Sequence, residues 1–119
     1  MSKMSDFQAF MDSLIDGVPA YSRQSVPSDA SMPYLTYNPF STAFGGVMPL
    51  QVDLWAHTAS ESEINAMAEQ VADKIGRGGG SFGEFWVKRG VPFVQALTDP
   101  DRSIKRRLIN LEIEILSDR

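Results

Sequence analysis

Apolar residues recur along the chain with two different periods, and these periods predict where helices and strands lie. Apolar positions at helical spacing over residues 7–18 and again over residues 60–76 predict two amphipathic helices. Ser5 and Gln8 have the spacing of a capping box for the first helix, and Ser60 opens a second box. A glycine follows the last periodic position of the second helix, where helices commonly end.

Five other runs have the composition or the two-residue alternation of β-strands. They are residues 33–37, 50–57, 84–88, 92–98 and 106–116. In the second run one side of the strand is apolar throughout and predicts a core face, whereas the other side is mostly polar. The last run alternates in the same way, so both runs predict strands with one buried face.

Glycine, proline and polar residues mark the connections between these elements. Residues 20–32 lack periodicity and predict a surface connection, and residues 44–46 predict the flexible tip of a hairpin. Residues 77–83 predict a glycine-rich loop. At Gly90 the sequence leaves two alternatives, a hairpin or one bent strand. Pro100 occupies the position that proline favours in a type I turn.

The order of elements predicts an α+β fold. We expect a mainly antiparallel sheet of four to five strands with the two helices packed on one face. The 119 residues fit one domain, residues 1–119, which should bury roughly two-thirds of its extended surface.

Composition and charge narrow the classes of function. The chain has a net charge of −4, which argues against broad nucleic-acid binding, since such binding depends on excess lysine and arginine. It has no cysteine, so disulfides, thiolate metal sites and cysteine nucleophiles are excluded. No apolar run approaches the roughly 20 residues of a membrane helix, and no signal peptide is evident. We therefore expect a protein made in the cytoplasm that contacts no membrane.

The candidate reactive groups have simpler structural explanations. His57 is the single histidine and predicts a surface or interface residue, because neither a metal site nor a triad can be assembled around it from spacing. Residues 76–83 lack the ending of a phosphate loop and follow a helix where such a loop would precede one. Asp99 and Asp101 lack calcium-loop spacing and fit a turn. We expect no enzymatic activity, no cofactor and no metal.

Aromatic and basic residues predict contacts between subunits. The aromatic residues exceed what one face of a small sheet buries, and aromatic side chains are enriched in interfaces. Four basic residues fall within residues 102–107. They are either a solvated strand end, which is the default, or a site for salt bridges to an acidic neighbour or for transient contact with DNA. The candidate interface residues are Trp55, Phe82, Phe85, Trp86, Arg89, Phe93, Lys105, Arg106 and Arg107.

Five segments together carry a resemblance to a known family. They are Val26-Pro27-x-Asp29-Ala30-x-x-Pro33-Tyr34-Leu35-Thr36-Tyr37, the strand at 50–56 with Trp55, the helix at 60–76, the Asp99-Pro100-Asp101 turn, and the closing Ile104-Lys105-Arg106-Arg107-Leu108-Ile109-Asn110-Leu111. Their order over residues 7–116 resembles the tail-terminator and minor tail proteins of long-tailed bacteriophages. Each motif is short, so the order of elements carries the resemblance.

The resemblance implies a virion assembly protein of the phage tail with no catalytic residues. Its expected form is a homo-oligomeric ring of six copies that caps the head-proximal end of the tail tube, ends tube polymerisation and offers a surface for head attachment. The implied partners are further copies of the chain, the tail tube protein and a neck or head-completion protein, with DNA passing transiently through the ring. The alternatives are a neck adaptor or stopper protein of the head–tail connector and a small-molecule-binding domain.

Overall fold

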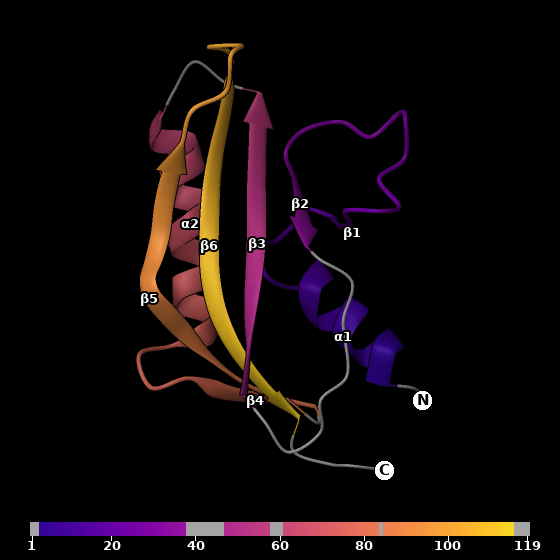
Figure 1. Cartoon of the computed structure of the whole chain (residues 1–119), viewed down its shortest axis with the longest axis vertical. Coiled ribbons are helices and arrows are strands. Elements are labelled where there is room, and N and C mark those ends of the chain that lie inside the picture. The colour runs from indigo at the N-terminus through magenta and orange to yellow at the C-terminus, as the bar shows by residue number, and fades with distance from the viewer. Residues whose placement is uncertain (1–2, 38–46, 58–60, 84, 116–119) are drawn as a thin grey trace.

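A six-stranded sheet with both helices on one of its faces forms the fold (Figure 1). The computed structural model describes residues 3–37, 47–57, 61–83 and 85–115. In chain order the elements are α1 (Lys3–Asp12), β1 (Ala20–Ser22), β2 (Tyr34–Tyr37), β3 (Val47–His57), α2 (Glu61–Ile75), β4 (Gly80–Phe82), β5 (Phe85–Leu97) and β6 (Ile104–Ile115).

The strand order in the sheet is β1-β2-β3-β6-β5-β4. All neighbours are antiparallel except β1 and β2, which are parallel. The α+β class and the two helices are confirmed, but the sheet is mixed and has six strands instead of four to five. The two additional strands, β1 and β4, have three residues each and lie in segments that the sequence predicted as a surface connection and a glycine loop. Strands this short show no readable alternation.

Helix α1 begins earlier than predicted, at Lys3 instead of residue 7, and it also ends earlier, at Asp12 instead of residue 18. It stops at Asp12 because polar side chains there bind backbone groups and compete with the helical pattern. The Asp12 carboxylate accepts a hydrogen bond from the Ala20 amide at 3.0 Å, and the Ser13 hydroxyl donates to the Phe10 carbonyl at 2.7 Å. The apolar residues that follow the helix are nevertheless buried, namely Leu14, Ile15 and Val18.

The predicted capping box of α1 is wrong, because Ser5 lies within the helix and not at its start. Gln8 instead connects elements: its amide nitrogen donates to the Ala20 carbonyl at 3.0 Å, and its side-chain oxygen accepts a hydrogen bond from the Tyr37 hydroxyl. Burial, and secondarily the charge of Asp12, raises the pKa of that phenol.

Helix α2 agrees with its prediction. Its buried side is formed by Ile64, Ala68, Val71 and Ile75. It ends at Gly76, which has φ of 80° and whose amide donates to the Ala72 carbonyl at 2.9 Å. The predicted capping residue Ser60 lies outside the described residues, as does the predicted hairpin tip at residues 44–46. Neither described helix has the length and apolarity needed to cross a membrane.

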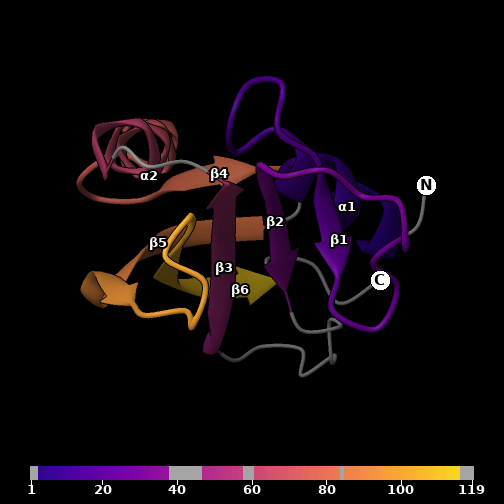
Figure 2. The ribbon, with the colours of Figure 1, turned by 90° about the horizontal axis from the view of Figure 1, so that it is seen from above.

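Aromatic contacts connect α1 to β2 near one edge of the sheet and to β5 and β4 near the other edge. Phe7 packs edge-on against Tyr37 of β2 at 5.4 Å between ring centroids and against Phe85 of β5 at 5.9 Å. Phe10 contacts Phe82 of β4 at 4.9 Å. Figure 2 shows both helices on the same side of the sheet. The core therefore lies between the helices and this face of the sheet, and neither of the two described helices lies on the opposite face.

Strand β5 is one bent strand, which decides between the two alternatives at Gly90. Arg89 pairs with Leu111 and Val94 with Ile109, so residues 90–93 of β5 lie opposite the single residue Asn110 of β6. The Asn110 amide holds this bulge by donating to the Pro92 carbonyl at 2.9 Å.

Candidate functional site

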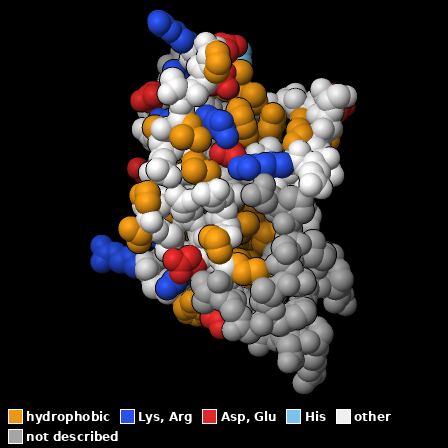
Figure 3. Space-filling model, in the orientation of Figure 1, with side chains coloured by type: hydrophobic (Ala, Val, Ile, Leu, Met, Phe, Trp, Pro, Cys, Tyr) orange, Lys and Arg blue, Asp and Glu red, His pale blue; other side chains and the backbone are white. Residues whose placement is uncertain are grey.

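The face of the sheet that neither described helix covers is a candidate surface. Strands β2, β3 and β6 are neighbours, and alternate residues of each strand point to this open face. Figure 3 shows this side of the molecule, where basic and acidic side chains lie beside apolar ones. The predicted core face of β3 is confirmed, since Leu50, Val52, Leu54 and Ala56 are all buried on the helix side.

Asp53 lies on the predicted polar side of β3 but is only 1% exposed. Two arginines cover it. Arg23, which follows β1, forms an ion pair with one carboxylate oxygen, and Arg106 of β6 pairs with the other at 3.2 Å. Buried carboxylates persist in proteins when they are paired and hydrogen-bonded in this way. The cluster contains two positive charges and one negative charge, so it carries an excess positive charge.

Trp55 is fixed next to this cluster. The Arg106 guanidinium lies 4.4 Å from the centroid of its ring, and the indole nitrogen donates to the Thr36 hydroxyl at 3.0 Å. A cation over the face of tryptophan is favourable by about 0.5–2 kcal/mol. Tyr34 is held by an edge-on contact with Tyr21 at 5.8 Å. The aromatic and basic side chains are therefore ordered by one another.

These side chains surround a hollow of about 400 Å³ on the open face. We call it the arginine hollow; its lining residues are Arg23, Val26, Tyr34, Thr36, Asp53, Trp55 and Arg106. An arginine presents five N–H donors, and the bonds of Arg23 and Arg106 to Asp53 use one nitrogen of each. The arrangement is suited to binding a carboxylate or another anion. It contains no nucleophile paired with a base.

The sequence predicted Trp55 and Arg106 but not the other residues of this hollow. Arg23 and Val26 lie in the segment predicted as a surface connection without periodicity. Asp53 carried one usable signal, since aspartate is depleted in strand interiors and a mid-strand aspartate needs a partner.

The predicted basic cluster does not form one patch, because successive residues of β6 point to opposite faces. Arg106 belongs to the arginine hollow, whereas Arg107 is buried against α2, where it donates to Asn65 at 3.2 and 3.3 Å and lies 3.6 Å from Glu61. The Lys105 amine donates to the Arg102 carbonyl at 3.0 Å. Burial removes Arg107 from the candidate contact residues.

The predicted aromatic candidates also divide by exposure. Phe85 is fully buried in the core and leaves the set of contact candidates, since such a side chain cannot meet another protein without disrupting the fold. Phe82 and Phe93 are partly buried and pack against the core. Arg89 lies over Phe93 at 5.5 Å and donates to the Ala72 carbonyl of α2 at 2.8 Å. Trp86 is 37% exposed and stays a candidate.

His57 lies at the end of β3 beside the turn between β5 and β6. Its Nε2 is 3.0 Å from the Ser103 hydroxyl, and that hydroxyl also donates to the Asp101 carboxylate at 2.7 Å. Hydrogen bonds from Ser103 lower the pKa of Asp101. The order differs from a catalytic triad, in which the acid orients the histidine and not the serine. We interpret these contacts as hydrogen bonds that stabilise the turn between β5 and β6.

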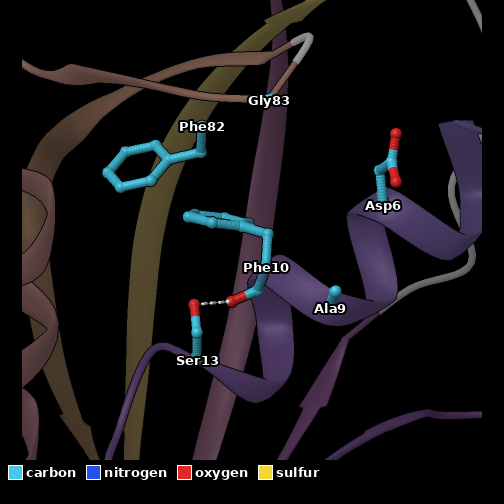
Figure 4. Close-up of a pocket in the computed structure, with 6 residues that line it drawn as sticks. All are labelled: Asp6, Ala9, Phe10, Ser13, Phe82 and Gly83. Carbon is cyan, nitrogen blue, oxygen red and sulfur yellow. Dashed lines mark hydrogen bonds between the residues drawn. The ribbon is translucent and has the colours of Figure 1, made fainter.

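A second hollow, of about 380 Å³, lies between α1 and β4 (Figure 4). The Phe10 and Phe82 rings face it from the two elements, and Asp6 is on its rim. This hollow is mostly apolar. Within the described parts of the chain, no group of three or more histidine, cysteine or acidic residues could hold a metal ion.

Comparisons with known proteins give no relative from which a function could be transferred. No family model matches the chain, and neither a curated protein nor a solved structure matches it significantly.

Proposed function

We propose that this protein is a phage virion assembly protein whose copies close into a ring that caps the head-proximal end of the tail tube. The ring ends tube polymerisation and provides the surface to which the head attaches. The proposal combines the resemblance in the order of elements with the surfaces that the fold leaves uncovered. The expected partners are sister copies, the tube protein and a neck or head-completion protein, with DNA passing through the ring.

The observation that carries the proposal is the unpaired edge of β5. Strand β4 pairs only with the first residues of β5, from Phe85 to Val87. In the described part of the sheet, the rest of β5 therefore has a neighbour on one side only. Val91, in this unpaired part, is 97% exposed, and Trp86, in the part that pairs with β4, is 37% exposed. An unpaired edge with exposed apolar side chains favours strand addition or apolar contact with another chain.

A ring also requires two different complementary patches on each copy. The arginine hollow and the β5 edge lie on different elements, so each copy offers distinct surfaces for two neighbours.

The test is to delete the gene from the phage that carries it and to examine the lysate by electron microscopy. The proposal predicts tails of uncontrolled length. Normal tails lying beside leaking heads would instead assign the chain to the neck, as a connector adaptor or stopper. Normal infectious particles would overturn both assembly roles.

A small-molecule-binding domain is favoured by one observation, the arginine hollow itself, whose volume of about 400 Å³ lies within the range of ligand pockets. Its signature would be a monomer that binds a small carboxylate in calorimetry and is absent from the virion.

A further inference from the structure

The outer surface of α2 is acidic. The residues that point directly away from the sheet follow one another at steps of four, three and four, which places them in one line along the helix. They are Ser62, Ala66, Glu69 and Asp73, and all four are exposed. Neither Glu69 nor Asp73 takes part in an ion pair with any residue that the structure describes. This line is therefore a small-residue segment followed by two carboxylates without a basic partner among the described residues.

The arginine hollow has the complementary charge. Asp53 neutralises only one of its two arginines, and Arg23 and Arg106 are held against opposite oxygens of the same carboxylate. Their side chains are 38% and 29% exposed, so both retain accessible donors. Carboxylates four residues apart on a helix are separated by about 6 Å along its axis. Arg23 and Arg106 lie on opposite oxygens of one carboxylate, so they present two separate groups of donors.

The two surfaces lie on opposite sides of the molecule. Helix α2 covers one face of the sheet, and the hollow opens on the other face (Figures 1 and 3). They cannot meet within one chain, but they can meet between chains. A contact of this kind joins unlike patches, and repeating it generates a ring when the rotation closes.

We infer that the outer surface of α2 in one copy docks on the arginine hollow of the next copy. Glu69 and Asp73 accept hydrogen bonds from Arg23 and Arg106, and Ala66 allows the helix to approach the sheet closely. The occupant is a second copy because the chain itself supplies an acidic helix of matching charge. The inference rests on the proposed ring and names the contact that builds it.

The chain has no cysteine, so introduced cysteines can be cross-linked without a reaction at native thiols, and this makes the contact testable. Val26 lines the hollow, and Ala66 is the exposed small residue that precedes Glu69 on the outer surface of α2. The double variant Val26→Cys/Ala66→Cys, treated with a short bismaleimide, should give a ladder of oligomers in a denaturing gel. A pair that replaces Ala66→Cys with Ser81→Cys, on exposed β4, should give no ladder.

Charge reversal then tests the chemistry. Adding Asp73→Lys to the Val26→Cys/Ala66→Cys variant should lower the yield of cross-linked oligomers about tenfold, because a like charge then faces the arginines. Asp6→Lys makes the same change of charge at the α1–β4 hollow and should leave the yield unchanged. Asp73 is exposed on the outer side of α2, so loss of folding does not confuse the result.

Three outcomes would overturn the docking. The first is no ladder above that of the Ser81→Cys pair, and the second is equal yields for Asp73→Lys and Asp6→Lys. The third is a ladder that free glutarate at low salt abolishes to the same extent in the protein with Asp73→Lys and in the protein without it. That result would make the hollow a site for small carboxylates.

The proposed function and this contact can fail separately. Overlong tails in the deletion phage without a ladder retain the proposed function and reject this contact. A ladder with normal tails retains the contact and rejects the tail role.

Discussion

Asp53 determines how the open face is organised. A carboxylate that is 1% exposed is unfavourable unless it is paired, and both of its oxygens bind an arginine. This pairing draws the segment after β1 onto the sheet through Arg23 and orients Arg106 over Trp55. One residue therefore holds the loop, the charge and the aromatic ring in place. Its loss should affect stability and the hollow together.

We expect Asp53→Asn to lower the free energy of unfolding by about 1–3 kcal/mol, since a neutral amide cannot replace two charge-assisted bonds and both arginines are partly solvated. Urea unfolding followed by circular dichroism measures this change. Asp29→Asn is the matched control, because Asp29 is exposed and should shift stability by less than about 0.5 kcal/mol. Equal stabilities of the two variants would contradict the role given to Asp53.

Asp101 provides a pH-dependent prediction. Hydrogen bonds from Ser103 hold the pKa of Asp101 below its ordinary value of 3.8. A lowered folded-state pKa stabilises the fold above the ordinary value, and this contribution is lost as the pH falls through the lowered pKa. Ser103→Ala should raise the pKa of Asp101 in a carboxyl NMR titration, whereas Ser81→Ala should not. An unchanged pKa in Ser103→Ala would reject the assigned hydrogen bonds.

At the scale of elements, periodicity predicted the long segments. Helix α2 and strands β3 and β6 contain enough periods for one buried face to be recognised, as Ile109, Leu111 and Ile113 illustrate. Strands β1 and β4 were missed because three residues show no period. The end of α1 was misplaced because side chains of Asp12 and Ser13, and not a break in apolar spacing, stop the helix.

The candidate site was less predictable than the fold for a physical reason. Alternation states which face a residue occupies, but it does not state which residues from distant segments meet there. Arg23 reaches Asp53 from a segment with no pattern, and adjacent Arg106 and Arg107 serve opposite faces. Only the register between β3 and β6 could have placed Trp55 opposite Arg106.

The bulge of β5 depends on Gly90. A Cβ at this position would lie 3.0 Å from the Asn110 carbonyl oxygen, so we expect Gly90→Ala to destabilise the protein by about 1–3 kcal/mol. Gly78→Ala, which would meet nothing within 4 Å, should change stability by less than about 0.5 kcal/mol. Thermal unfolding of the two variants provides the comparison. A Gly90→Ala protein as stable as Gly78→Ala would show that the close approach to Asn110 is not required.

At the scale of the whole molecule, the described residues bury one face of the sheet and leave the other face and part of the β5 edge without a covering element. The proposed ring gives these surfaces partners. It also predicts that exposed and buried aromatic residues of the same strand behave differently when they are replaced.

Trp86→Ser should leave the circular dichroism spectrum unchanged and weaken association of the copies in sedimentation, because this side chain is on the surface. Phe85→Ser should instead lower the free energy of unfolding by about 3–5 kcal/mol, since it empties a fully buried site. If Trp86→Ser also unfolds the protein, Trp86 belongs to the core. If it leaves association intact, Trp86 is not a contact residue.

The proposed tail role is tested most directly by a cryo-electron microscopy map of tails isolated from a phage whose genome carries the gene for this chain. The account predicts a closed ring of this chain, with six copies, at the head-proximal end of the tube and nowhere along its shaft. A map in which that position is filled by another protein, with this chain absent from the particle, would contradict it.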